Sequence, residues 1–174
     1  MFQYFQWNLK KEMELRHNGE MYHISPWGLS WNDENYYLVG YDSDDQMIKH
    51  YRVDKMLKIR MSDEPREGKK YFEKFDIGTY SRKNFSMFGG KEERVRLLMD
   101  NQMAGVVIDR FGKDVSMVPV DDNHFSINVD VVVSQQFFGW VFALGKGVKI
   151  IGPESVVQQV NQEIKRLVEQ YNME

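Results

Sequence analysis

The sequence contains no cysteine, which excludes disulfides, thiolate zinc sites and thiol nucleophiles. It has no apolar run near the ~20 residues that a membrane-spanning helix needs, and its first residues lack the order of a signal peptide. Positive charge is not in excess either: the net charge is -3, so the chain as a whole is not a polycation that would coat nucleic acid. We therefore expect a cytoplasmic protein with no membrane partner, in which any anion binding comes from a local patch.

Catalytic signatures are missing as well. The sequence has neither the Gly-x-Ser-x-Gly turn that holds an esterase-type nucleophile nor a Ser-x-x-Lys motif. Its four histidines are scattered without the spacing of metal ligands. Paired aspartates such as Asp121-Asp122 fall in expected turns, where aspartate is favoured because it hydrogen bonds to its own backbone. We expect no metal, no cofactor and no enzymatic activity.

The composition does favour a packed core, since 42% of the residues are hydrophobic and 28% are charged. The pattern changes twice along the chain and predicts three parts. Residues 1–61 have the alternation of short strands, residues 62–91 have the composition of a polar linker with a short helix, and residues 92–174 mix strands with helices.

The first part contains five short candidate strands. Asn18-Gly19 predicts a tight hairpin, because both residues accept positive φ angles. Two further strands, over residues 36–41 and 48–56, flank an acidic turn. Closure of a sheet removes its exposed edges, so this set of short strands predicts a small closed β-barrel of the Sm or SH3 type.

The last part reads strand, helix, strand, strand, helix, strand, helix. This order is typical of a ferredoxin-like unit with an added C-terminal helix, and it makes the whole chain an α+β protein. Ser134 is placed to cap the helix over residues 135–145. That helix is apolar nearly all round, so it belongs either to the core or to a subunit interface.

Positive charge gathers in one short strip. Residues 49–60 contain five Lys and Arg residues plus His50, against Asp54 as the one acid. Alternate residues of a strand share a face, so His50 and Arg52 should project together, with Lys55 close by. A guanidinium fork suits phosphate, and a nearby ammonium group adds a point charge.

Aromatic rings accompany the strip. Tyr37 and Tyr41 share one face of the preceding strand, and a nucleobase can stack on an exposed ring. Cations beside rings predict a site for single-stranded nucleic acid or a nucleotide. The alternative is a solvated face on which Arg52 pairs with Asp54 and the tyrosines lie half in the core. His23 adds a second alternative: it could line a polar pocket with the nearby Ser25 or be an ordinary surface histidine.

These segments resemble a known family. The stretch "ISPWGLSWNDENYYLVGYD" followed by "IKHYRVDKM" resembles the WYL domain of bacterial transcriptional regulators. The name-giving triplet corresponds to residues 36–38, the Pro-x-x-Leu signature to residues 26–29, and the arginine-containing signature to residues 51–56. The later "LGKGVKIIGPESV" is similar to the C-terminal extension called WCX.

The resemblance implies an Sm-like or SH3-like barrel, a ferredoxin-like second part and a regulatory role. Such regulators usually carry a helix-turn-helix domain before the barrel, bind a nucleic-acid or nucleotide ligand that alters DNA binding, and are often homodimers. Arg52 falls on the first family arginine, Lys55 replaces the second, and Tyr37 is the central aromatic of the triplet. His23 and Ser25 fall where the family often places polar pocket residues.

Two departures from the family pattern affect the expected ligand and the expected DNA binding. Lysine at position 55 lacks the bidentate fork of arginine, and no helix-turn-helix pattern occurs in these residues. We therefore expect the sensing part of a longer regulator, in which an anionic ligand bound at the basic strip controls an attached DNA-binding domain. The alternative from another class is an oligomerisation or protein-interaction module without a ligand.

Overall fold

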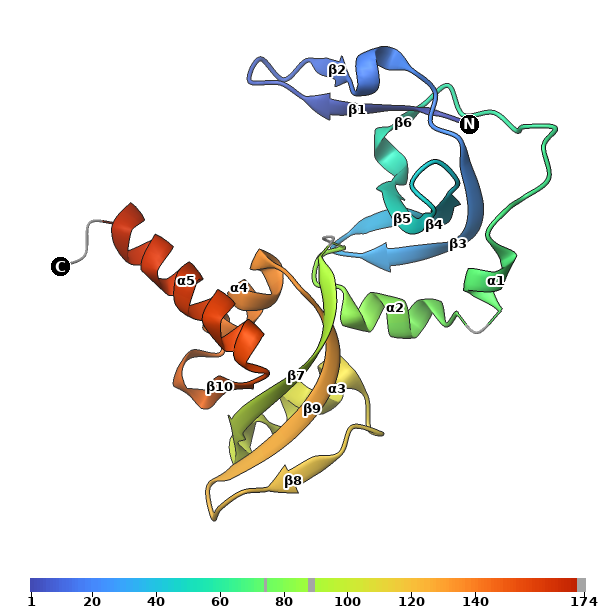
Figure 1. The fold of residues 1–174 in the computed structure, drawn as a ribbon. Coiled ribbons are helices and arrows are strands. Elements are labelled where there is room, and N and C mark those ends of the chain that lie inside the picture. The colour runs from blue at the N-terminus through green and yellow to red at the C-terminus, as the bar shows by residue number, and fades with distance from the viewer. Residues whose placement is uncertain (74, 88–89, 172–174) are drawn as a thin grey trace. The chain divides into compact units, whose positions relative to one another are not determined.

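The computed structural model describes residues 1–73, 75–87 and 90–171 (Figure 1). The chain divides into two compact units, Met1–Ser81 and Arg82–Glu174, called unit 1 and unit 2 below. Both units combine antiparallel sheets with helices, which confirms the α+β class. No helix in the described part of the chain is long and apolar enough to cross a membrane.

Unit 1 is built from two three-stranded antiparallel sheets. The first has the order β2-β1-β6, with β1 at Gln3–Trp7, β2 at Met13–Leu15 and β6 at Met56–Leu57. The second has the order β3-β4-β5, with β3 at Ile24–Asn32, β4 at Asn35–Asp42 and β5 at Met47–Arg52. Its helices are α1 (Lys69–Phe72) and α2 (Ile77–Lys83), and α2 crosses the boundary between the units.

The two sheets do not close into the expected barrel. Among the described residues they are linked by a single bridge, Phe2 to Tyr22, and not by a continuous ladder. The 3₁₀ helix η2 (Val53–Lys55) separates β5 from β6, and just before it the backbone N–H of Arg52 donates to the Tyr4 hydroxyl at 3.0 Å. The expectation of a closed barrel is therefore wrong.

The hairpin predicted at Asn18-Gly19 is also wrong. Strand β2 pairs with β1, placing Trp7 opposite Met13. The connecting turn is held by Asn8, whose Oδ1 accepts hydrogen bonds from the N–H groups of Lys10 and Glu12. Asn18 and Gly19 do have positive φ angles, 52° and 83°, but they use them in a 3₁₀ turn rather than in a strand reversal.

Aromatic side chains fill the space between the two sheets. Phe2, Tyr4, Tyr22 and Tyr51 form a cluster in which Phe2 stacks on Tyr22 at 5.5 Å between centroids and meets Tyr51 edge-on at 5.2 Å. Offset and edge-to-face geometries are the favoured ones for aromatic pairs. The two sheets of unit 1 are therefore joined by side-chain packing and isolated hydrogen bonds. A closed barrel would instead join them by a continuous ladder of backbone hydrogen bonds.

One face of the β3-β4-β5 sheet is covered by the helical segment of unit 1. The hydroxyl groups of Ser30 and Ser81 lie 2.5 Å apart, and Nδ1 of His50 lies 2.8 Å from the Tyr80 hydroxyl. A Cβ on Gly28 would lie 2.7 Å from the side chain of Ile77, so the glycine allows a close approach. These contacts place residues 77–81 on that face of the sheet.

Unit 2 has one four-stranded antiparallel sheet in the order β10-β7-β9-β8. The strands are β7 (Lys91–Asp100), β8 (Met117–Pro119), β9 (His124–Val133) and β10 (Val148–Gly152). The helices are α3 (Ala104–Phe111), α4 (Gln135–Ala143) and α5 (Glu154–Gln170). The order of strands and helices matches the prediction, and β7 and β9 run side by side through the unit (Figure 1).

The core of unit 2 lies between one sheet face and the helices. Leu97 and Ile127 face each other across β7 and β9, and neither is exposed to solvent. Phe137 of α4 and Val107 of α3 complete this core. Helix α4 begins as predicted, because the Ser134 hydroxyl accepts a hydrogen bond from the N–H of Phe137 at 3.2 Å.

Candidate ligand sites in unit 1

The predicted basic and aromatic face is the face that the helical segment covers. Tyr37 pairs with both Ser30 and Arg52 across the sheet, and these three residues lie on the same side as His50. Tyr37 is only 9% exposed, and His50 is engaged with Tyr80. The ring of Tyr37 therefore offers no open face on which a base could stack, contrary to the expectation from the sequence.

Arg52 forms an ion pair at the edge of this face. Its Nε and Nη2 atoms donate to Oδ1 and Oδ2 of Asp54 at 3.0 and 2.9 Å, and its side chain stays 33% exposed. The hydrogen bonds from Arg52 hold the pKa of the Asp54 carboxyl below its usual value. The pairing is the alternative that the sequence left open, and it leaves the guanidinium accessible to solvent.

Arg52 belongs to a small basic cluster, defined here as Arg16, Arg52 and Lys55. Burial raises the pKa of the Tyr4 hydroxyl, while the nearby charges of Arg52 and Arg16 oppose that rise. Lys55 lies close enough to Asp54 to favour its ionised form. Among the charges that act on the Tyr4 hydroxyl, the cations Arg16 and Arg52 outnumber the one carboxylate, that of Asp54.

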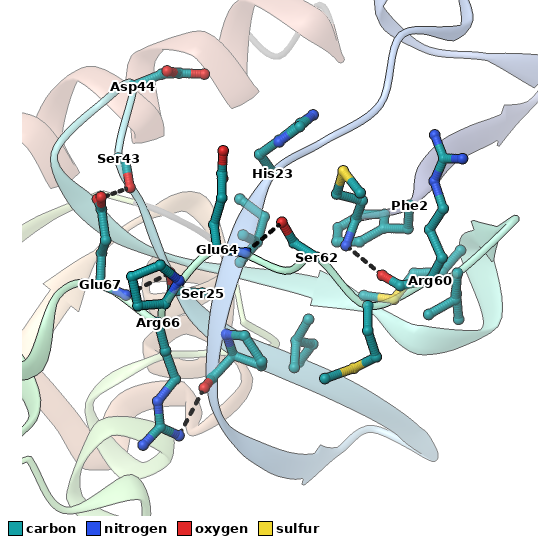
Figure 2. Close-up of a pocket in the computed structure, with 18 of the residues that line it drawn as sticks. Phe2, His23, Ser25, Ser43, Asp44, Arg60, Ser62, Glu64, Arg66 and Glu67 are labelled. Atoms are coloured by element: carbon teal, nitrogen blue, oxygen red, sulfur yellow. Dashed lines mark hydrogen bonds between the residues drawn. The ribbon is translucent and has the colours of Figure 1, made fainter.

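A separate pocket of about 940 Å³ opens within unit 1 (Figure 2). Leu29 and Leu38 pair across β3 and β4 and alternate with Ser30 and Tyr37, so they project from the opposite sheet face. The other apolar lining residues include Phe2, Val53, Met56, Ile59 and Met61. His23 and Ser25 line this pocket, whereas Tyr37, His50, Arg52 and Lys55 do not. The structure therefore separates the six predicted site residues.

Residues 62–67, named the strap here, supply the other wall of the pocket. Arg66 lies over the Trp27 ring at 3.7 Å and donates to the carbonyl oxygen of Pro26 at 3.2 Å. The backbone N–H of Glu67 donates to the Ser25 hydroxyl at 2.9 Å (Figure 2). The strap lies in the segment for which a linker was predicted, and the side chain of Arg66 and the backbone of Glu67 attach it to β3.

An exposed aromatic pair was not among the residues predicted from the sequence. Trp31 and Tyr36 are 59% and 56% exposed, and their rings meet at 4.7 Å between centroids. They face each other across β3 and β4 on the same side as Leu29 and Leu38. Strict strand alternation is the signal that could have found them, since it puts Tyr36 outside when Tyr37 is inside.

No metal site is formed in the part of the chain that the structure describes. No group of three or more His, Cys, Asp or Glu side chains comes together there in a way that could hold an ion.

Comparisons with known proteins add the family. The family model of the WYL domain matches residues 2–61, and that of the WCX domain matches residues 91–168. A search of curated proteins finds no match. Proteasome accessory factor B/C (PafBC) of Arthrobacter aurescens aligns over 98% of this chain and 25% of its own length, with 18% identity and a TM-score of 0.41.

A structure described as a CRISPR Cas-related protein aligns over 98% of this chain and 47% of its own length, with 11% identity and a TM-score of 0.49. The chain thus spans a quarter of the first structure and about half of the second. The two domain matches together cover most of the sequence. The chain belongs to the WYL-domain family, with a WYL domain followed by a WCX domain.

Proposed function

We propose that this chain is the sensing part of a bacterial transcriptional regulator. In this proposal it binds an anionic ligand in unit 1 and controls an attached DNA-binding helix-turn-helix domain. It acts by binding and not by catalysis, in the cytoplasm and as a homodimer. The pairing of a WYL with a WCX domain supports the regulatory role, and the basic cluster supports the choice of ligand.

The proposed ligand is a nucleotide or a short single strand bound at the basic cluster. Asp54 occupies the guanidinium fork of Arg52, so a phosphate group must exchange with it. The exchange requires little free energy, because a solvent-exposed ion pair contributes only about 0.2–1 kcal/mol to stability. Arginine binds phosphate through the same two N–H groups that now contact the carboxylate.

The experiment is a titration with short single-stranded DNA and with mixed nucleotides at low salt. Arg52→Ala should weaken binding about tenfold, because one charge-assisted hydrogen bond contributes roughly 1.5 kcal/mol or more. Asp54→Ala should strengthen binding, because it removes the competing carboxylate. In Arg52→Ala the slope of log affinity against log salt should become shallower by about 0.7 for each phosphate group that the variant no longer neutralises.

Arg166→Ala is the matched control. Arg166 also pairs with a carboxylate, that of Glu163, but on helix α5 of unit 2. Its replacement should leave binding unchanged. Equal affinities of the wild-type chain and the Arg52→Ala variant, or no binding at low salt, would remove the basic cluster from the proposal.

A second candidate function is self-association through unit 2. A groove of about 410 Å³ lies against α4, β10 and α5 and is largely apolar. Phe142 and Ile164, which line it, are 37% and 44% exposed. If a second copy covers this groove, Ile164→Lys should convert dimers to monomers in analytical ultracentrifugation while leaving ligand binding intact.

We also infer that unit 2 has the ferredoxin-like arrangement and that the domains meet their connecting segment near residues 61 and 92. The strand order β10-β7-β9-β8, with one helix after β7 and another after β9, supports the first inference. The limits of the two family matches support the second.

A further inference from the structure

The pocket of unit 1 is unlike the basic cluster in its chemistry. Its walls are mainly side chains without hydrogen-bonding groups, contributed by β3, β4, η2 and β6. Leu29 remains 59% exposed, Ile59 64% and Met61 91%, so apolar surface is open to solvent. Burial of such apolar surface against a ligand stabilises a complex by about 25 cal/mol per Å².

The charged groups at the pocket are mostly acidic or already engaged. Arg66 is held by the Trp27 ring and the carbonyl oxygen of Pro26. Asp44, Glu64 and Glu67 contribute carboxylates to the lining (Figure 2). Three carboxylates repel a ligand with several negative charges, so the lining disfavours nucleic acid and nucleotides.

Arg60 is the cation that remains available. It lines the pocket, and within the described ranges its guanidinium takes part in no hydrogen bond or ion pair. A guanidinium fork binds one carboxylate through two parallel hydrogen bonds. The serine hydroxyls of Ser43 and Ser62 lie in the same lining and are additional polar groups at the pocket.

We propose that this pocket binds an amphipathic monocarboxylate of the fatty-acid type. Its alkyl chain packs against Leu29, Leu38 and Met56, and its carboxylate pairs with Arg60. The volume of about 940 Å³ lies within the range of roughly 300–1,000 Å³ that is typical of small-molecule sites. Methionine side chains such as Met56 and Met61 are flexible and adapt to chains of different length. This site is independent of the basic cluster.

The test is calorimetric titration with straight-chain carboxylates of eight to twelve carbons, kept below their micelle concentrations. Affinity should rise about threefold to fourfold for each added methylene group, because each buried CH₂ stabilises the complex by about 0.8 kcal/mol. The alcohol of the same length should bind about tenfold more weakly than the carboxylate, because it lacks the charge-assisted hydrogen bonds with Arg60.

Two pairs of variants locate the site. Leu29→Gln should weaken binding at least tenfold, whereas Leu9→Gln, at a fully exposed position outside the pocket, should not change it. Arg60→Gln should weaken binding of the carboxylate but not of the alcohol. Its control, Lys58→Gln, removes a nearby exposed cation that does not line the pocket and should have no effect.

Three results would overturn the proposal. The first is an affinity that does not depend on chain length. The second is an equal loss of binding in the Leu29→Gln and Leu9→Gln variants. The third is competition between the carboxylate and an oligonucleotide, together with loss of carboxylate binding in Arg52→Ala, since that result would place both ligands at the basic cluster. The circular dichroism spectrum of each variant should match that of the wild-type chain. The reason is that the four substituted positions, 9, 29, 58 and 60, are all substantially exposed.

Discussion

The two units of this chain are stabilised in different ways. Nine large side chains are essentially inaccessible to solvent among the described residues, and Val39 is the one that comes from unit 1. The buried set of unit 1 is instead rich in hydrogen-bonding groups, with Tyr37, Tyr41, Tyr51 and Asp42 all buried. Unit 2 therefore has a closed apolar core, while unit 1 is held by aromatic contacts and hydrogen bonds around an open pocket.

This difference matters for function. A core made only of apolar side chains is close-packed and resists rearrangement. A cluster of tyrosines and polar groups can exchange partners when a ligand offers new ones, so long as each buried polar group stays satisfied. Unit 1 contains both candidate ligand sites, so the more adaptable unit is also the one in which we propose binding.

The largest expected effect tests the apolar core of unit 2. Phe137 of α4 is fully buried, so Phe137→Ala should destabilise unit 2 by about 3–5 kcal/mol. Phe142 lies near the end of the same helix and is 37% exposed, so Phe142→Ala should cost far less. Hydrogen exchange followed by mass spectrometry separates the units, because each peptide reports its own segment.

The outcome also decides whether the units are independent. If they are, Phe137→Ala should speed exchange in peptides of residues 91–171 and leave peptides of residues 1–73 at their wild-type rates. Equal acceleration in both units would show one cooperative structure. The contrast between a rigid and an adaptable unit would then fail.

The second effect concerns how closely the backbone is approached in each unit. A Cβ on Gly40 would lie 2.5 Å from Ile24 Cγ2 and 2.8 Å from the carbonyl oxygen of Ser25, so β3 and β4 leave no room for it. Gly40→Ala should therefore destabilise unit 1 by about 1–3 kcal/mol through overpacking.

Gly139 gives the opposite case on helix α4. A Cβ there meets nothing within 4 Å, so Gly139→Ala should stabilise unit 2 by about 0.5–1 kcal/mol, the difference in helix propensity. Urea unfolding of both variants measures the sign of each change in the free energy of unfolding. A stabilising Gly40→Ala would mean that β3 and β4 can move apart easily in solution.

The sequence was most informative where a pattern is local. The order of elements in unit 2 follows from alternation in the strands and from caps such as Ser134, and the structure agrees with it. In unit 1 the cation-rich strip is real, and Arg52 pairs with Asp54 in the way that one of the two sequence interpretations described.

The sequence was least informative where distant segments meet. Strand β2 could pair with β1 or with the residues after Gly19, and local turn preference favoured the wrong partner. Burial of Tyr37 depends on residues 77–81, which lie about forty positions later in a segment of linker-like composition. The pocket depends on the strap in the same way, and no short pattern encodes such a contact.

The third expected effect concerns Asp42 and its hydrogen-bond partners, the polar centre of unit 1, and depends on pH. Asp42 is buried, and its carboxylate accepts hydrogen bonds from Lys49 Nζ at 2.7 Å and from the N–H groups of Asp44 and Asp45 at 3.1 and 3.2 Å. Burial alone would raise the pKa of Asp42, but Lys49 and the N–H donors outweigh it, and the pKa lies below its usual value.

A carboxyl whose pKa is lower in the folded state than in the unfolded state stabilises the fold above the unfolded pKa, near 4. That stabilisation is lost as pH falls through the lower, folded pKa.

Asp42→Asn should therefore destabilise unit 1 by about 1–2 kcal/mol at pH 7 and flatten its loss of stability below pH 4. Protection factors of residues 35–52, which divide out the change of the intrinsic exchange rate with pH, measure the destabilisation and its pH dependence from pH 7 to pH 3. Asp121→Asn in unit 2 should leave the same peptides unchanged, because Asp121 is exposed and pairs with His124 of its own unit. If wild-type unit 1 were insensitive to acid over this range, the buried hydrogen bonds of Asp42 would not be what holds the β4–β5 turn, and the polar centre would not distinguish unit 1 from unit 2.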